Sequence, residues 1–147
     1  QKGDGGKIEE DKHELKKWIS IIPVVAVLAI VLALTFQSPA GTTHLSETVR
    51  KWIGYNGTSH QFRSDVHYVE YFIVGLVVAV FGLNMRWKAW LPGVLGCCFG
   101  LIDETIKIFL PIREFEIVDL MKDFIGVWVG VLVVGLVSYL VKGGHRG

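Results

Sequence analysis

Apolar residues fill four long windows that contain no Asp, Glu, Lys or Arg, at residues 18–46, 71–85, 89–102 and 124–141. The hydrocarbon core of a bilayer is about 30 Å thick, and a helix needs ~20 residues to cross it. The pattern therefore predicts an all-α, polytopic membrane protein with a compact bundle of four transmembrane helices. We expect these helices at about residues 18–36, 66–83, 90–110 and 119–140.

Polar segments flank the predicted spans. We expect a cytoplasmic N-terminal tail or short surface helix at residues 1–17, a membrane domain at residues 18–141, and a cytoplasmic tail at residues 142–147. Within the membrane domain, residues 37–65 are expected to form an extracytoplasmic loop. The first apolar run exceeds the ~7–15 residues of a secretory signal, although Ser38-Pro39-Ala40 leaves a cleaved signal peptide as the lesser alternative.

The distribution of basic residues predicts the orientation. Cytoplasmic flanks of membrane helices carry an excess of Lys and Arg. One side of the predicted bundle holds seven of them, Lys12, Lys16, Lys17, Arg86, Lys88, Lys142 and Arg146. The other side holds four, Arg50, Lys51, Arg63 and Arg113. The bias places both termini in the cytoplasm.

The composition supports the membrane class and excludes others. The chain has 147 residues, of which 51% are hydrophobic and 20% charged, and the apolar windows leave too little chain for a sizeable soluble domain. Its 15 Lys and Arg against 14 Asp and Glu give a net charge of +1, which leaves no basic footprint for nucleic acid.

Ionisable residues inside the spans are the main functional signal. Asp103, Glu104 and Lys107 lie in the third span. Three charges at the membrane centre would oppose insertion of this helix by roughly 8–10 kcal/mol, whereas its apolar residues favour insertion by only about 3–6 kcal/mol. These charges must therefore sit off-centre, pair, or face water within the bundle. A rise of 1.5 Å per residue from Trp90 puts Asp103 about 20 Å along the helix, near its outer end.

The other spans bring polar groups to the same end. His67, Glu70 and Tyr71 lie near the outer end of the second span, and Asp119 and Asp123 begin the fourth. Helical phase places the third-span charges on one face with Gly93, Gly96 and Gly100, and the fourth-span carboxylates on one face with Gly126 and Gly130. Glycines at this spacing allow close helix approach, so we expect an outward-opening polar pocket above tightly packed helices.

Local pairing is the alternative interpretation of these charges. Asp103 and Lys107, like Arg63 and His67, are four residues apart, and Asp119 precedes Lys122 by three. Such spacings allow pairing along a single helix. Asp119 could also act only as a helix cap, and His67 as an interior histidine with satisfied hydrogen bonds.

The same residues resemble the VanZ-like family of small bacterial membrane proteins. Its run R-K-x-x-H-x-x-E-Y is matched by Arg63, His67, Glu70 and Tyr71, with Ser64 in place of Lys. Its later signature D-E-x-x-Q-x-F-x-P-x-R, followed by Asp and a Gly-rich helix, is matched by Asp103, Glu104, Phe109, Pro111, Arg113, Asp119, Asp123, Gly126 and Gly130. The departures are Ile106 where His is common, Lys107 for Gln and Ile112 for Gly.

The resemblance covers roughly residues 30–135 and implies a bacterial plasma-membrane protein. Members are associated with resistance to teicoplanin, a lipidated glycopeptide antibiotic that binds the D-alanyl-D-alanine end of peptidoglycan precursors. It therefore indicates a contribution to glycopeptide resistance or cell-envelope maintenance, and leaves the chemistry open.

Our first hypothesis is a binding pocket without catalysis. It would take a group of a lipid, a peptidoglycan precursor or the antibiotic, with basic side chains holding carboxylate or phosphate and acidic ones meeting amines or hydroxyls. We expect no cofactor, no resident metal and no nucleic-acid partner. The candidate binding residues are Arg63, His67, Glu70, Tyr71, Asp103, Glu104, Lys107, Arg113, Asp119 and Asp123.

The second hypothesis is a membrane-embedded hydrolase or transferase acting on a cell-wall or lipid substrate at the outer leaflet. Glu104 or Glu70 would be the general base and His67 the acid or orienting group, and a metal could bind through His67 with carboxylates. The chain has no H-E-x-x-H and no G-x-S-x-G motif. Proton-coupled transport, a third class, would use the same carboxylates.

Overall fold

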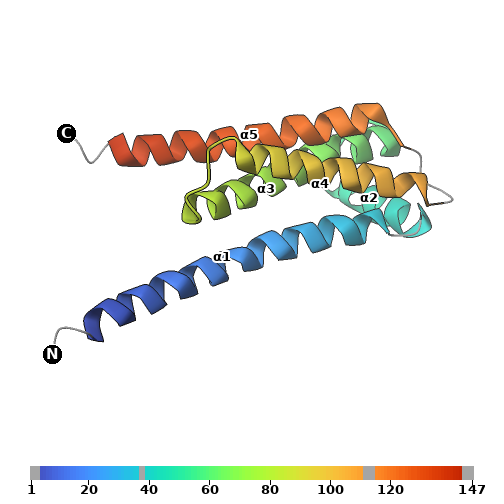
Figure 1. Ribbon diagram of the computed structural model, residues 1–147. Coiled ribbons are helices and arrows are strands. Elements are labelled where there is room, and N and C mark those ends of the chain that lie inside the picture. The colour runs from blue at the N-terminus through green and yellow to red at the C-terminus, as the bar shows by residue number, and fades with distance from the viewer. Residues whose placement is uncertain (1–3, 37–38, 111–114, 144–147) are drawn as a thin grey trace.

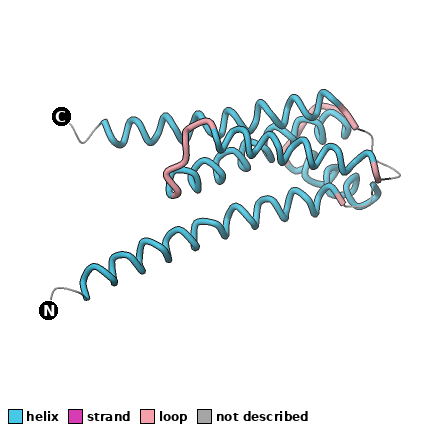
Figure 2. Tube along the Cα trace, in the orientation of Figure 1, coloured by secondary structure: helices cyan, strands magenta, loops and turns pink. Residues whose placement is uncertain are grey.

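The computed structural model describes residues 4–36, 39–110 and 115–143, apart from the side chains of residues 4–7, 13, 39–43 and 45. These residues form five helices and no strand (Figures 1 and 2), which confirms the all-α prediction. The helices are α1 (Asp4–Thr35), α2 (Pro39–Trp52), α3 (Ser59–Asn84), α4 (Leu91–Ile108) and α5 (Ile117–Gly143).

The four long helices alternate in direction. Helices α3 and α5 lie side by side and form the most extensive helix pair, α4 packs against both, and α1 runs along α3 (Figure 1). The N- and C-terminal ends lie together at one end of the bundle, called here the termini end, and α2 lies at the opposite end, called the α2 end (Figure 1).

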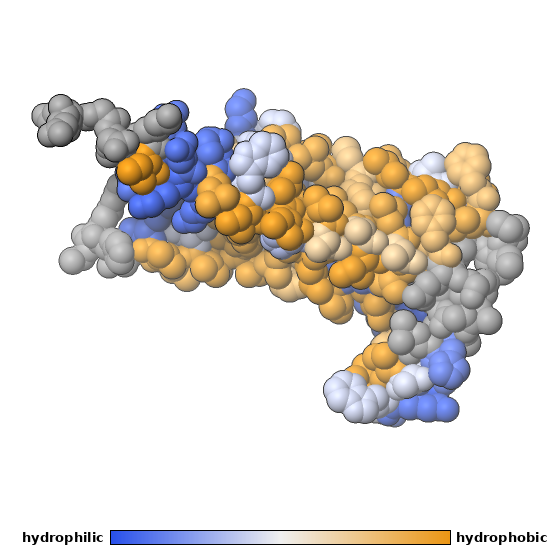
Figure 3. All heavy atoms as spheres, turned by 90° about the horizontal axis from the view of Figure 1, so that it is seen from below, coloured by the Kyte–Doolittle hydropathy of each residue, from blue (hydrophilic) through white to orange (hydrophobic). Residues whose placement is uncertain are grey.

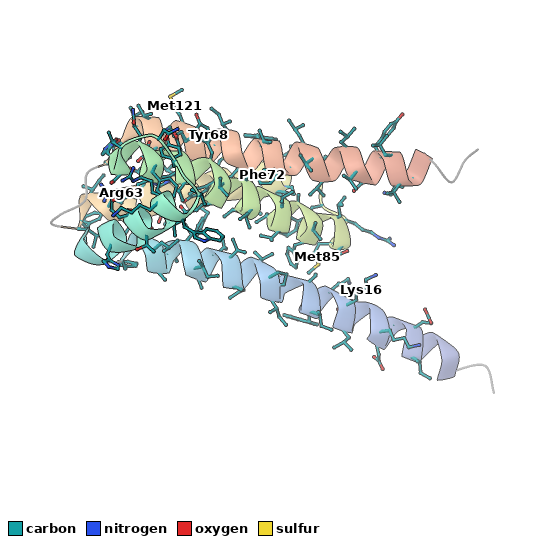
Figure 4. All side chains as sticks on the ribbon, turned by 180° about the vertical axis from the view of Figure 1, so that it is seen from behind. Lys16, Arg63, Tyr68, Phe72, Met85 and Met121 are labelled. Atoms are coloured by element: carbon teal, nitrogen blue, oxygen red, sulfur yellow. The ribbon has the colours of Figure 1, made fainter. Side chains whose placement is uncertain are left out.

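Glycines bring α3 and α5 into backbone contact. A Cβ atom on Gly126 would lie 2.7 Å from the carbonyl oxygen of Tyr68, and one on Gly130 would lie 2.5 Å from that of Phe72. Tyr68 and Phe72 are marked on α3 in Figure 4. No larger residue fits at either position without displacing backbone, so the predicted close approach at the Gly126/Gly130 pair is confirmed.

The core is small and the outside is apolar. Residues Val31, Tyr71, Val74, Val78, Ala79, Val127 and Val131 form the buried cluster between α1, α3 and α5. Large apolar side chains cover much of the remaining surface, for example Leu132 at 67% and Val141 at 63% exposure. Hydrophilic residues gather toward the two ends of the face shown in Figure 3. A continuous apolar surface of this kind suits the lipid core of a membrane.

Three of the described helical segments are long and apolar enough to cross a membrane, Ile8–Thr35, Ser59–Asn84 and Ile117–Gly143. Helix α4 is not among them because its 18 residues include Asp103, Glu104 and Lys107. The four-span bundle and the cytoplasmic position of the termini therefore stay predictions.

Several element boundaries differ from those expected. The segment predicted as a loop, residues 37–65, contains α2 and the first turns of α3. Helix α3 begins at Ser59 because Thr58 and Gln61 form a capping box, with the Gln61 amide 3.2 Å from the Thr58 hydroxyl and the Thr58 amide 3.0 Å from the Gln61 side chain. At the N-terminus, α1 continues without a break from Asp4 into the first apolar run.

Candidate functional site

A cavity of about 190 Å³ lies at the α2 end, between the last turns of α1, helix α2, the first turns of α3 and the end of α4. It has charged and apolar walls. The lining residues are Val31, Leu34, Thr35, Ser46, Val49, Phe62, Arg63, Val66, His67, Glu70, Asp103 and Lys107. Five residues predicted from the sequence thus reach this cavity, and Figure 4 marks Arg63 at this end of the molecule.

Asp103 connects α4 to α1. Its side chain is 1% exposed, and the Thr35 hydroxyl donates a hydrogen bond to its carboxylate. The Thr35 hydroxyl also lies 3.1 Å from the carbonyl oxygen of Val31. Sequence reasoning missed Thr35, although a hydroxyl at the end of an apolar run is the kind of group that a buried carboxylate needs.

Glu104 is fully buried and its oxygens are both occupied. The Lys107 ammonium lies 2.5 Å from Oε2, and the backbone amide of Glu116 donates to Oε1 at 2.8 Å. Glu104 does not line the cavity, so the structure does not place it where a general base would meet a ligand. The Asp103–Lys107 pair that the alternative interpretation allowed does not form, because Lys107 pairs with Glu104 and Asp103 bonds to Thr35.

His67 joins α3 to α5 at the wall of the cavity. Its Nδ1 lies 2.8 Å from Oδ1 of Asp123, and its Nε2 lies 3.8 Å from Oδ2 of Asp119. Asp119 and Asp123 are one turn apart on α5, so Asp123 is hydrogen-bonded to one imidazole nitrogen while the Asp119 carboxylate lies near the other. Neither carboxylate lines the cavity itself, and both reach it through His67.

A second polar group lies behind His67. Ser64 donates to Oδ1 of Asp119 at 2.6 Å, and the Lys122 ammonium lies 2.5 Å from the Ser64 hydroxyl and 3.3 Å from Oδ1 of Asp65. The pairing of Asp119 with Lys122 that the alternative interpretation allowed does not form, because the Lys122 ammonium lies next to Ser64 and Asp65 of α3. Sequence reasoning missed both Ser64 as a partner and Lys122 as a bridging cation.

Three buried side-chain atoms have no hydrogen bond to any described residue, Nε of Arg50, the hydroxyl of Tyr71 and Oδ2 of Asp123. A buried polar atom left unsatisfied costs about 1–3 kcal/mol. Asp123 bonds to the cavity-lining His67, and Tyr71 lies one turn from His67 on α3. This end of the bundle therefore has hydrogen-bonding capacity that the described contacts do not use.

Glu70 is a cavity-lining acid whose carboxylate can accept hydrogen bonds from a ligand. Its half-buried carboxylate forms no hydrogen bond or ion pair within the part of the chain that the structure describes, whereas Asp103 is bonded to Thr35. A carboxylate inside an apolar helix pair is costly without a partner. Glu70 is therefore suited to receive an amine or hydroxyl from a ligand.

Outside the helical spans, a tyrosine contributes to the electrostatics of the same end. The Tyr55 hydroxyl donates to Oδ2 of Asp65 at 2.6 Å. This hydrogen bond, assisted by the nearby negative charge, raises the pKa of Tyr55 above its ordinary value. The neutral, donating form of Tyr55 is therefore favoured beside Asp65.

Two further predictions concern Arg113, a candidate binding residue, and a possible metal site. Arg113 and Pro111 fall outside the described residues, so the second signature is seen in part. Within the described ranges, no three His, Cys, Asp or Glu side chains are arranged to hold a metal ion. The residues at hand instead offer hydrogen bonds and charges to a small polar group.

Comparison with known proteins identifies the family. Neither the curated proteins nor the solved structures gave a significant match. The sequence profile of the VanZ/LLP1 family matches residues 20–138, which include both signatures, the cavity-lining helices and the His67–Asp123 pair. This membrane protein therefore belongs to the VanZ/LLP1 family.

Proposed function

We propose that the protein contributes to glycopeptide resistance or cell-envelope maintenance by binding a polar group of a lipid, a peptidoglycan precursor or the antibiotic in the cavity at the α2 end. The observation that carries this proposal is the Glu70 carboxylate, which has no hydrogen-bond or ion-pair partner among the described residues, in a cavity that Arg63 and Lys107 also line. The association of the VanZ-like family with teicoplanin resistance supports glycopeptide resistance as the biological process in which the cavity would act.

The lining favours a ligand with an amine or hydroxyl beside a carboxylate or phosphate. Glu70 would accept hydrogen bonds from the first group, and the cations would hold the second. Apolar residues of α2 and α3, such as Val49 and Phe62, would contact an attached hydrocarbon segment. Because the volume is about 190 Å³, the cavity accommodates a headgroup or terminal group and not a whole glycopeptide.

The proposed orientation puts this cavity at the outer leaflet of the bacterial plasma membrane. Both termini would be cytoplasmic, in line with the excess of Lys and Arg beside them. The cavity lies at the α2 end, away from the termini, which supports access from the outer face (Figure 1).

Binding to the full chain in lipid nanodiscs tests the proposal. A lipid-linked peptidoglycan precursor, phosphatidylethanolamine and teicoplanin are titrated separately by calorimetry against wild type and Glu70→Gln. A hydrogen bond to a charged group is worth about 1.5–3 kcal/mol, so we expect binding of the true ligand to weaken about 10- to 100-fold in Glu70→Gln.

Asp65→Asn is the matched control, since Asp65 is an exposed carboxylate on the same helix that does not line the cavity. It should leave affinity unchanged. No binding of any of the three probes to wild type, or equal affinity in Glu70→Gln, contradicts the proposal.

A second candidate function is a hydrolase or transferase at the same cavity. The observation that favours it is the imidazole of His67, which lines the cavity and is oriented by Asp123 at 2.8 Å as a catalytic acid or base would be. Incubation of the protein with the lipid-linked precursor, followed by mass spectrometry, separates the two functions. New products that disappear in His67→Gln support catalysis, whereas an intact bound precursor supports binding alone.

A further inference from the structure

A second polar cavity lies at the termini end, between α1 and the end of α3. Its volume is about 210 Å³, and its lining consists of Lys16, Lys17, Leu83, Asn84 and Arg86. Figure 4 shows Lys16 on α1 near Met85, the C-cap residue that follows the last residue of α3. The three basic side chains come from two segments that are far apart in the sequence.

Positive charge in this cavity is only partly neutralised. Lys17 pairs with Glu14 at 2.5 Å. The side chains of Lys16 and Arg86 form no hydrogen bond or ion pair with any residue in the described ranges, and both residues are exposed. The cavity therefore offers two available cations and an amide side chain, a combination that suits an anion with several oxygen atoms.

The backbone at Arg86 is an independent sign of function. The Trp87 amide bonds to the carbonyl of Gly82 at 2.8 Å and the Arg86 amide to that of Leu83 at 3.2 Å, which is the Schellman pattern at a helix end. The pattern needs a left-handed residue, usually Gly, yet this position holds Arg86 with φ 55°. An unfavourable backbone conformation kept at a charged residue points to a role for its side chain.

An apolar groove adjoins the basic cavity. Its volume is about 590 Å³, and Leu83 lines both hollows. The groove walls carry the aromatic residues Trp87, Trp90, Trp128 and Tyr139. Trp and Tyr are enriched where membrane proteins meet the lipid headgroups, so this end lies at the depth of an interface. An anion in the basic cavity would therefore have hydrocarbon-compatible walls beside it.

We propose that the cavity formed by Lys16, Lys17 and Arg86 binds the phosphate headgroup of an anionic phospholipid, with an acyl chain of that lipid against the groove beyond Leu83. Basic cavities between membrane helices are suited to such headgroups. This site is separate from the cavity at the α2 end and does not depend on the function proposed for it.

Native mass spectrometry of the full chain tests the site. The protein is released from mixed micelles containing phosphatidylglycerol or phosphatidylcholine, and bound lipid is counted. Wild type should retain phosphatidylglycerol in preference to phosphatidylcholine. Each basic residue near an anionic headgroup contributes about a fivefold change in binding, so Lys16→Gln and Arg86→Gly should each weaken retention about fivefold.

Arg86→Gly separates binding from folding. Glycine suits the left-handed position, so this variant should melt at the same or a higher temperature while losing lipid. Lys142→Gln is the matched control, because Lys142 is a basic residue at the same end that does not line the cavity. It should keep wild-type retention.

Three outcomes overturn the proposal. They are equal retention of the two lipids by wild type, equal loss in Lys142→Gln, and displacement of phosphatidylglycerol by inorganic phosphate at millimolar concentration. Equal retention of the two lipids would show that headgroup charge is not recognised, and equal loss in Lys142→Gln would show only a general attraction of the basic flanks for anionic lipid. Displacement by phosphate would show a site for a free anion.

Discussion

At the scale of single residues, the two buried carboxylates of α4, Asp103 and Glu104, are bonded to partners from other segments of the chain. The expected inward face of the third span, Gly93, Gly96, Gly100, Asp103, Glu104 and Lys107, is buried as a set. The partners of Asp103 and Glu104 differ because they come from segments outside α4. The Thr35 hydroxyl donates to Asp103, and the Glu116 amide donates to Glu104. The helical spacing of residues within α4 contains no information on these two partners.

The buried Glu104–Lys107 pair leads to a stability prediction. Removing one member leaves an uncompensated buried charge, which typically costs about 3–5 kcal/mol. We expect Lys107→Met to lower the free energy of unfolding by that amount in detergent micelles. Adding Glu104→Gln to Lys107→Met should recover a large part of the loss. A single variant as stable as wild type would show that the pair contributes nothing.

Tyr55 gives a prediction for alkaline pH. Because its pKa is raised, the hydrogen bond to Asp65 stabilises the fold below the ordinary tyrosine pKa of about 10 and is lost as pH rises through the raised value. Subtracting the ultraviolet pH titration of Tyr55→Phe from that of wild type isolates the signal of Tyr55. It should show this tyrosine ionising above the ordinary tyrosine pKa. In Asp65→Asn the titration should return to the ordinary pKa, and an unchanged curve contradicts the assignment.

At the scale of elements, the apolar windows predict the long helices, and short polar signals decide where they begin. The capping box of Thr58 and Gln61 extends α3 back to Ser59. Helix α2 was missed because its segment, Pro39–Trp52, lacks the length of a span and was assigned by orientation to a loop. Helix α2 is amphipathic in its own sequence and packs against α3, and a search for long apolar runs does not detect an amphipathic helix of this length.

The α3–α5 contact is testable with two glycines. Gly126→Val would push a side chain against the Tyr68 backbone, so we expect a loss of about 1–3 kcal/mol or more in the free energy of unfolding. Gly135→Ala is the control, since a Cβ there meets nothing within 4 Å and alanine favours a helix by about 1 kcal/mol. Equal tolerance of the two substitutions would mean that α3 and α5 do not touch.

At the scale of the whole molecule, the alternation of four long helices agrees with the predicted path of the chain. The convergence of polar side chains at one end also follows the sequence prediction, since residues of α3 and α4 line one cavity and those of α5 reach it through His67. The contributions of α1 and α2 could not be predicted, because Thr35, Ser46 and Val49 are ordinary residues in their own segments.

The orientation is checked by labelling single cysteines in intact cells, on a background with Cys97 and Cys98 replaced. A cysteine at Trp52, which is 86% exposed at the α2 end, should react with a membrane-impermeant maleimide. A cysteine at Lys142 should react only after the cells are opened. The reverse pattern would place the termini outside.

Helix α1 belongs to both cavities, through Val31, Leu34 and Thr35 at one end and Lys16 and Lys17 at the other. Between them it diverges from α3 toward its N-terminus (Figure 1). At 1.5 Å per residue its 32 residues span about 48 Å, so a tilt of about 10° about Thr35 would carry its far end by roughly 8 Å. Such a tilt would link the two proposed sites mechanically, and thermodynamic linkage makes any coupling between them equal in both directions.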